Sequence, residues 1–119
     1  HIEMEDIDVQ FMNRVMKVIN KNIENTKLSV EMLAKEVGLS RVQLHRKIKT
    51  LTGTTPREFI RNIRLKQAAN LLKSNNVAIS QVSYAVGFMN PTSFSVVFKS
   101  FYGCTPSEYA EEYNRNSQA

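Results

Sequence analysis

Residues 33–60 read LAKEVGLSRVQLHRKIKTLTGTTPREFI, and residues 82–110 read VSYAVGFMNPTSFSVVFKSFYGCTPSEYA. The two stretches align at an offset of 49 up to a shared Val-Gly step and at an offset of 50 after it. The positions that match hold core-type apolar residues or residues that start and stop helices, which is what a duplicated supersecondary unit retains. The sequence therefore predicts two copies of one small unit.

The first copy is predicted to be two helices joined by a short turn. Ser29 can cap a helix that runs to Val37, and Gly38 can take the left-handed conformation that ends it. Ser40 and Gln43 then have the spacing of a capping box for the next helix. That helix turns one apolar face inward, with residues spaced four and three apart: Leu44, Ile48 and Leu51. Two helices around a Gly-containing turn form a helix-turn-helix motif.

The second copy follows the same order. Gly87 ends its first helix, which begins at Ala78 and therefore lacks a capping side chain. Asn90-Pro91 starts the second helix with a cap and a proline at the first helical position, and Gly103 ends it. Its predicted buried stripe is aromatic: Phe94, Phe98 and Phe101.

Each copy is followed by Thr-Pro-x-Glu, at residues 55–58 and 105–108, which combines a capping box with proline at the first helical position. The first instance opens a long bridging helix to about residue 73, and the second opens a short helix ending near Asn114. Upstream, Asp6 or Asp8 can cap a helix to about Ile23. Its Met-containing stripe predicts core packing, with a partner interface as the alternative.

The predicted fold is all-α, with about seven helices in two helix-turn-helix subdomains joined by a long linker helix. The expected segments are a flexible N-terminus (1–7), a first subdomain (8–55), the linker helix (56–74), a second subdomain (78–114) and a flexible tail (115–119).

The composition excludes several protein classes. Hydrophobic residues make up 42% and charged residues 23% of the 119 residues, which is typical of a globular domain. No apolar run approaches the roughly 18 residues that a membrane span needs, and no signal peptide is recognisable at the start. The single cysteine, Cys104, permits no internal disulfide, and no Cys/His cluster has zinc-ligand spacing. We therefore expect a cytoplasmic protein with no cofactor, no metal and no catalytic residues.

Charge is unevenly distributed along the chain. Residues 37–107 contain ten basic residues and one acidic residue, Glu58, whereas the other acidic residues gather toward the two ends. A basic middle indicates a polyanionic partner. The alternative is a solvated, lysine-rich surface.

With these motifs the chain resembles the AraC-type DNA-binding domain, which has two helix-turn-helix units joined by a long helix. The resemblance covers roughly residues 7–113, including both Val-Gly turns and both Thr-Pro-x-Glu starts. Residues 11–34 are also similar to the segment that precedes this domain in hybrid two-component regulators of Bacteroides type. The resemblance thus implies the output domain of a two-component protein that regulates transcription, with a stand-alone regulator of the same family as the alternative.

The second helix of such a motif enters the major groove of DNA, so its outward side chains are the candidate contacts. In the first copy we expect base contacts from Val42, His45 and Arg46, because Arg pairs with guanine O6 and N7 and Val can contact a thymine methyl group. Surface roles without DNA contact are the alternatives for His45 and Arg46.

The second copy departs from the family because Val96 stands where relatives often have a long polar side chain. We expect base or shape contacts from Thr92, Ser93 and Val96, with a merely packing or phosphate-gripping helix as the alternative. Phosphate contacts are expected from polar and basic residues on both recognition helices: Ser40, Arg41, Gln43, Lys47, Lys49, Asn90, Ser95 and Lys99.

Double-stranded DNA is the expected partner, and RNA polymerase is a further candidate. The isolated domain is expected to be monomeric, with dimerisation open for a full-length protein. On the bridging helix, Arg64 has two open roles, an internal salt bridge and a DNA contact. Rival functions are a helical protein-interaction module, which would need an exposed apolar groove, and an enzyme, for which no catalytic constellation is visible.

Overall fold

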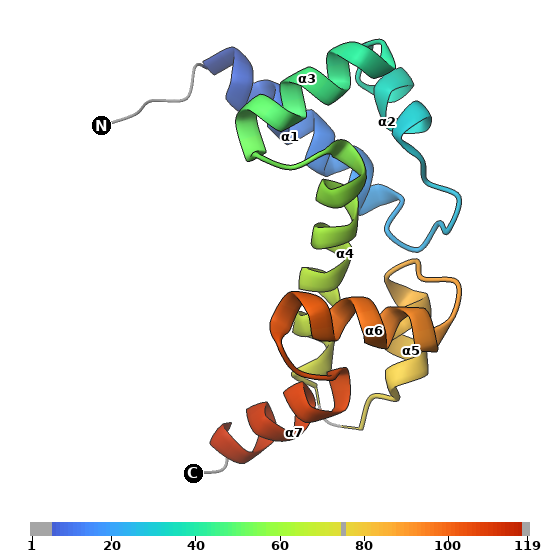
Figure 1. Cartoon of the computed structure of the whole chain (residues 1–119), viewed down its shortest axis with the longest axis vertical. Coiled ribbons are helices and arrows are strands. Elements are labelled where there is room, and N and C mark those ends of the chain that lie inside the picture. The colour runs from blue at the N-terminus through green and yellow to red at the C-terminus, as the bar shows by residue number, and fades with distance from the viewer. Residues whose placement is uncertain (1–5, 75, 118–119) are drawn as a thin grey trace. The chain divides into compact units, whose positions relative to one another are not determined.

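A computed structural model describes residues 6–74 and 76–117, and these residues form seven α-helices and no strand (Figure 1). The predicted all-α fold is therefore confirmed. The helices are α1 (Asp6–Lys21), α2 (Val30–Glu36), α3 (Arg41–Thr52), α4 (Pro56–Leu72), α5 (Ile79–Ala85), α6 (Pro91–Tyr102) and α7 (Pro106–Ser117). They group into two compact units, and α4 supplies residues to both, with the division after Arg61.

The first unit consists of α1, α2, α3 and the start of α4. Its core is formed by one apolar stripe from each of the first three helices, all with almost no exposure: Phe11, Val15, Ile19, Leu33, Leu44 and Ile48. Helix α2 packs against both α1 and α3. The upstream helix therefore belongs to the core of this unit, as its periodicity predicted.

Local signals set the ends of α3. The Ser40 hydroxyl accepts a hydrogen bond from the Gln43 N–H at 3.1 Å, and the Gln43 side-chain oxygen accepts one from the Ser40 N–H at 2.9 Å. This reciprocal pair is the predicted capping box. At the other end Gly53 has φ +77°, a left-handed conformation that costs glycine little and other residues more.

The second unit comprises the rest of α4, together with α5, α6, α7 and the short segment Glu24–Thr26. Its core contains fully buried residues from α4, α5, the residue that follows α5, and α6: Leu65, Leu72, Val82, Val86, Phe94 and Phe98. Aromatic rings continue this core toward α7, with the ring of Phe98 4.6 Å from Tyr102 and 5.6 Å from Tyr109.

One predicted core position of α6 is wrong. Phe101 is 40% exposed, and Tyr102 contacts Phe98 and Tyr109 instead. Spacings of three and four both satisfy the helical period, so positions 101 and 102 flank the same stripe. The packing of α7 decides which of the two faces the core.

Several helix ends differ from the expected ones. Helix α1 ends at Lys21 and α4 at Leu72, each about two residues before the end expected near Ile23 and residue 74. Helix α1 begins at Asp6, so residues 6 and 7 of the expected flexible N-terminus are helical, and residues 1–5 lie outside the described residues. Helix α7 continues to Ser117, past the expected end at Asn114, because no proline or glycine intervenes to stop it. Residues 118–119 of the expected tail also lie outside the described residues.

Arg64 on α4 has an internal role in the second unit. Its guanidinium donates hydrogen bonds to the Asn25 carbonyl at 2.7 Å and to the Gly87 carbonyl at 3.3 Å. Burial lowers the pKa of this half-buried guanidinium from its ordinary value. Of the two open roles, the internal one is therefore supported, but the acceptors are backbone carbonyls, not a carboxylate. Arg64 thereby fixes the turn after α5 that leads into α6.

Within the described residues, no helix combines the length and the apolar character that crossing a lipid bilayer would require.

Candidate nucleic-acid interface

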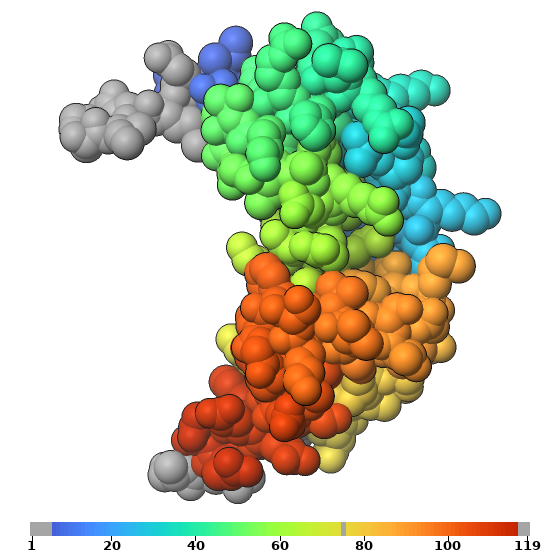
Figure 2. Space-filling model, viewed as in Figure 1, coloured from blue at the N-terminus to red at the C-terminus, as the bar shows by residue number. Residues whose placement is uncertain are grey.

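The outward face of α3 gathers the three side chains that were predicted to contact bases. Val42 is 66% exposed, and His45 and Arg46 are exposed beside it. They line a surface depression of about 600 Å³ together with other α3 residues: Arg41, Lys49 and Thr50. The green surface of the first unit in Figure 2 includes this helix. The structure thus brings the predicted base contacts together on one helix face.

The burial of α3 explains this arrangement. Leu44 and Ile48 have no exposed surface. The residues on the opposite side of the helix must therefore face outward. Val42, Arg46 and Lys49 are spaced by four and three and therefore share that outward side. The face combines one apolar side chain with several cations, a mixture that suits both base edges and phosphates.

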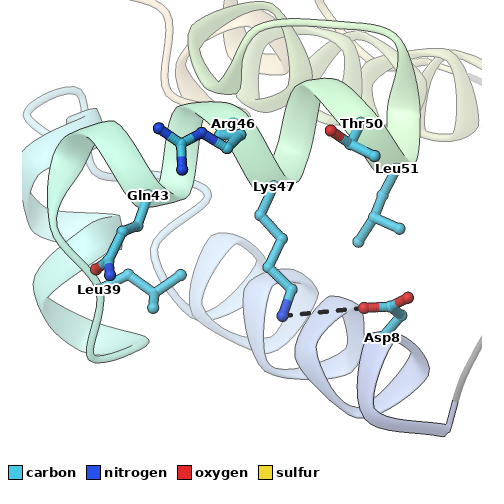
Figure 3. A pocket seen from close by; sticks show the side chains of 7 residues that line it. All are labelled: Asp8, Leu39, Gln43, Arg46, Lys47, Thr50 and Leu51. Carbon is cyan, nitrogen blue, oxygen red and sulfur yellow. Dashed lines mark ion pairs between the residues drawn. The ribbon is translucent and has the colours of Figure 1, made fainter.

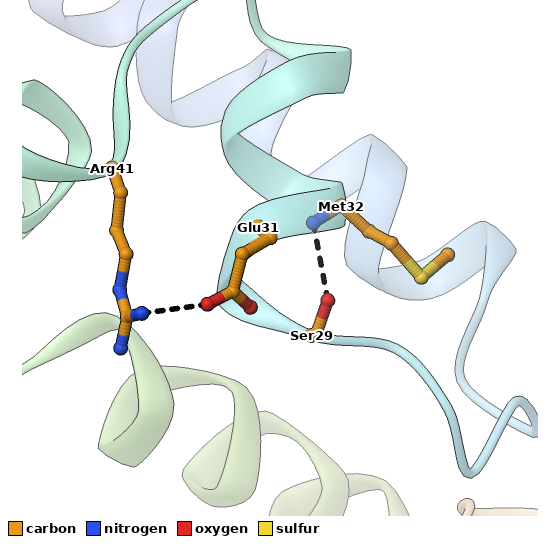
Figure 4. A network of polar contacts seen from close by, with 4 residues as sticks. All are labelled: Ser29, Glu31, Met32 and Arg41. Atoms are coloured by element: carbon orange, nitrogen blue, oxygen red, sulfur yellow. Dashed lines mark hydrogen bonds and ion pairs between the residues drawn. The ribbon is translucent and has the colours of Figure 1, made fainter.

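An ion pair holds Arg41 at the start of α3. Its guanidinium lies 2.7 Å from a carboxylate oxygen of Glu31 on α2, whose own N-terminus is capped by Ser29 (Figure 4). A cation in the first turn of a helix is unfavourable because of the helix dipole, and Glu31 offsets this. Glu31 was not singled out from the sequence because ten residues separate it from Arg41.

Lys47 differs from the other predicted phosphate contacts. Its ammonium group lies 3.9 Å from a carboxylate oxygen of Asp8 and 4.7 Å from the ring centre of the buried Phe11, both on α1. Figure 3 shows Lys47 reaching toward α1, while Arg46 leaves α3 in a different direction. A depression of about 380 Å³ lies here, lined by Asp8, Leu39, Gln43, Arg46, Lys47, Thr50 and Leu51. The structure thus gives Lys47 a contact with α1.

Several other predicted phosphate contacts make hydrogen bonds within the chain. Ser40 and Gln43 form the capping box, and the Lys49 ammonium donates to the Gly53 carbonyl at 3.1 Å. Ser40, Gln43 and Lys49 are exposed, and each keeps at least one donor that these bonds do not use.

Helix α6 presents a different face in the second unit. Thr92 and Ser93 are exposed, Val96 is 67% exposed, and Ser95 is half-buried. The Asn90 side chain caps the helix by accepting from the Ser93 N–H at 2.7 Å. Lys99 is the one cation on this helix. Helices α3 and α6 therefore start with a capping side chain and end at a left-handed glycine, but their exposed side chains differ. Those on α3 include several long cations, whereas those on α6 are mostly short and uncharged.

Comparison with known proteins agrees with this duplicated arrangement. Residues 33–112 match a family model described as a helix-turn-helix domain. A transcriptional regulator with an AraC-type DNA-binding domain from Chromobacterium violaceum has a similar structure, with a TM-score of 0.81 and 31% identity over 87% of this chain and 92% of that one. The DNA-binding domain of the global transcriptional factor AdpA, solved in complex with a target DNA, has a TM-score of 0.81 and 25% identity over 92% of this chain and 97% of that one.

A much longer relative is also similar. Histidine kinase P4 of Formosa agariphila is 42% identical over 113 residues, which are 95% of this chain and 8% of that protein. The chain therefore spans a small fraction of this relative's length, and the kinase name says nothing about catalysis by the matching segment.

Proposed function

Because the chain belongs to the AraC-type family of helix-turn-helix DNA-binding domains of transcription regulators, we propose that its two units read successive major grooves of one duplex, with α3 supplying most of the specificity. The observation that carries this proposal is the outward face of α3, where Val42, His45 and Arg46 lie together beside exposed cations.

Arg46 is the strongest candidate for base recognition. Its exposed, planar guanidinium can donate two parallel hydrogen bonds to O6 and N7 of guanine, which is the commonest specific contact in the major groove. His45 can donate or accept at a neighbouring base edge, and Val42 can contact a thymine methyl group. We therefore propose that the site of the first unit contains at least one guanine.

The flanking groups supply affinity without sequence information. On α3 these are Arg41, Lys49 and the capping-box residues Ser40 and Gln43, and on α6 they are Asn90, Ser95 and Lys99. We propose that Lys47 instead anchors α3 to α1, since its ammonium group lies 3.9 Å from the Asp8 carboxylate and 4.7 Å from the centre of the Phe11 ring.

We further propose that the domain is the output segment of a two-component signalling protein. The 42% identity to a segment of a protein named a histidine kinase supports this, because the matching segment is only 8% of that protein's length. Reading the coding sequence upstream of His1 tests the proposal. A kinase domain in the same frame supports it, and a ligand-binding domain in its place would favour a stand-alone regulator. We also propose that the protein is located in the cytoplasm and that the isolated domain is monomeric. RNA polymerase is proposed as a further partner.

Selection of bound duplexes from a random oligonucleotide pool tests the DNA-binding function. We expect the domain to enrich a site with two elements about one helical turn apart, and to bind it less tightly as salt rises. On that site Arg46→Ala should weaken binding by about 5- to 150-fold, equivalent to roughly 1–3 kcal/mol, while binding to random DNA changes little. Equal losses on both kinds of DNA would remove Arg46 from base recognition.

A further inference from the structure

The outward face of α6 has an exposed apolar residue at its centre. Val96 is 67% exposed, and it occupies the place in the repeat that Arg46 holds in the first unit. Its exposed neighbours one turn earlier, Thr92 and Ser93, are short. Toward the other end of the helix, Ser100 is short as well, and the long exposed side chains are Lys99 and the 40% exposed Phe101.

Side-chain length decides how closely a recognition helix can approach base edges. On α3 the outward side chains of Arg46 and His45 are long, so they would hold the α3 backbone farther from the bases. On α6 the short side chains allow the backbone to enter the groove more deeply. At that distance the two methyl groups of Val96 and the one of Thr92 can touch base edges directly.

The chemistry of the groove then limits what Val96 can recognise. The polar edge atoms of the four bases all require a donor or an acceptor, and valine has neither. The one apolar feature in the major groove is the methyl group on C5 of thymine, which cytosine lacks unless it is methylated. Contact with that methyl group removes exposed apolar surface from water on both sides.

Resting on the proposed DNA-binding function, we infer that the outward face of α6 recognises C5-methyl groups of pyrimidines. The second unit then selects a thymine-rich element, whereas the first selects an element containing guanine. Shape recognition by α6, the alternative for this helix, does not require an exposed valine. By the usual value for burying one methyl-sized group, each contacted methyl group should change affinity about fourfold.

The test compares two selections from the same random pool, one amplified with dTTP and the other with dUTP. Deoxyuridine pairs as thymidine does but lacks the C5-methyl group, so the two pools differ only in that group. With dTTP we expect a two-element site. With dUTP we expect the guanine-containing element to persist and the thymine-rich element to lose its sequence preference. In the selected site, replacing two contacted thymines by uracil should weaken binding by about tenfold or more.

Two variants assign the effect to α6. Val96→Ser should reduce the difference in affinity between the thymine and uracil forms of the second element, because only the Thr92 methyl group remains, whereas Val9→Ser, a change at a 41% exposed valine on α1, should keep the wild-type difference. This separation matters because Val42 in the first unit is expected to contact a methyl group of its own element. In the wild-type domain, 5-methylcytosine in place of a contacted thymine should restore part of the affinity that unmethylated cytosine loses.

The outcomes separate the inference from the function on which it rests. The same second element in both pools, or an undiminished thymine preference in Val96→Ser, overturns methyl recognition by α6 and leaves DNA binding intact. Failure to enrich any sequence in either pool overturns both. Loss of the second element with dUTP, together with a reduced thymine preference in Val96→Ser, supports the inference.

Discussion

The same substitution at two lysines of α3, two residues apart, should affect stability in one case and DNA binding in the other. Lys47 contacts Asp8 and the Phe11 ring on α1, whereas Lys49 is exposed and donates to the Gly53 carbonyl at the end of its own helix. We therefore expect Lys47→Met to lower the free energy of unfolding and Lys49→Met to weaken DNA binding. Methionine preserves an unbranched side chain and removes the charge in both cases.

The magnitudes follow from the contacts. A cation over an aromatic ring contributes about 0.5–1 kcal/mol, and a partly exposed ion pair contributes at most about 1 kcal/mol. The Lys47–Asp8 pair is at 3.9 Å, with side chains that are 36% and 26% exposed, so its contribution is at the lower end of that range. Lys47→Met should thus lower the free energy of unfolding by about 1 kcal/mol, which corresponds to a melting temperature about 4 °C lower.

For Lys49 the expected change is in the salt dependence of DNA binding. Loss of one phosphate contact should reduce the slope of log affinity against log salt by about 0.9. Between about 50 and 200 mM salt, that contact accounts for a change of about 3.5-fold in affinity. Lys47→Met should leave this slope unchanged.

Urea unfolding followed by circular dichroism measures the first effect, and fluorescence anisotropy with a labelled duplex over a salt series measures the second. Each variant serves as the control for the other. If Lys47→Met reduced the salt slope as much as Lys49→Met and left unfolding unchanged, Lys47 would be a phosphate contact and its assigned role as an anchor to α1 would be refuted.

Three further predictions concern charges elsewhere in the domain. Glu31→Gln should tighten binding to all DNA sequences by about two- to threefold in an anisotropy titration. The reason is that Arg41 no longer has to break its ion pair with Glu31 before it contacts a phosphate. Weaker binding would contradict this. The Thr55 and Thr105 hydrogen bonds lower the pKa of the Glu58 and Glu108 carboxyls, so the stability that they contribute is complete above the ordinary pKa of 4.5 and is lost as the pH falls below it. In urea titrations from pH 6 to pH 3, the double variant Glu58→Gln/Glu108→Gln should therefore lose less stability than the wild type, and an identical pH profile would reject the role of these carboxyls. Arg64→Met should lower the free energy of unfolding by about 2 kcal/mol, because the Asn25 and Gly87 carbonyls lose a charged donor, and a change within the error of a urea melt would show that water replaces the guanidinium there.

Much of the fold could be predicted from short-range signals. The capping box of Ser40 and Gln43, the left-handed Gly38 and the missing cap at Ala78 all occur as the sequence indicated. Such signals act between residues at most four positions apart, so the local sequence is enough to define them. The face of α3 that carries Val42, His45 and Arg46 followed in the same way, from the periodicity of the buried Leu44 and Ile48.

By itself, the sequence determined the number of helices, most of their ends and the repeat that pairs one helix-turn-helix with another. Only the tertiary structure decided what the long side chains do, such as Lys47 against α1, Arg41 beside Glu31 and Arg64 on two backbone carbonyls. It also decided that Tyr102, not Phe101, completes the aromatic core. The physical reason is that helix ends and faces depend on neighbours along the chain, whereas a flexible cation or a residue at the border of a stripe takes its partner from an element far away in the sequence.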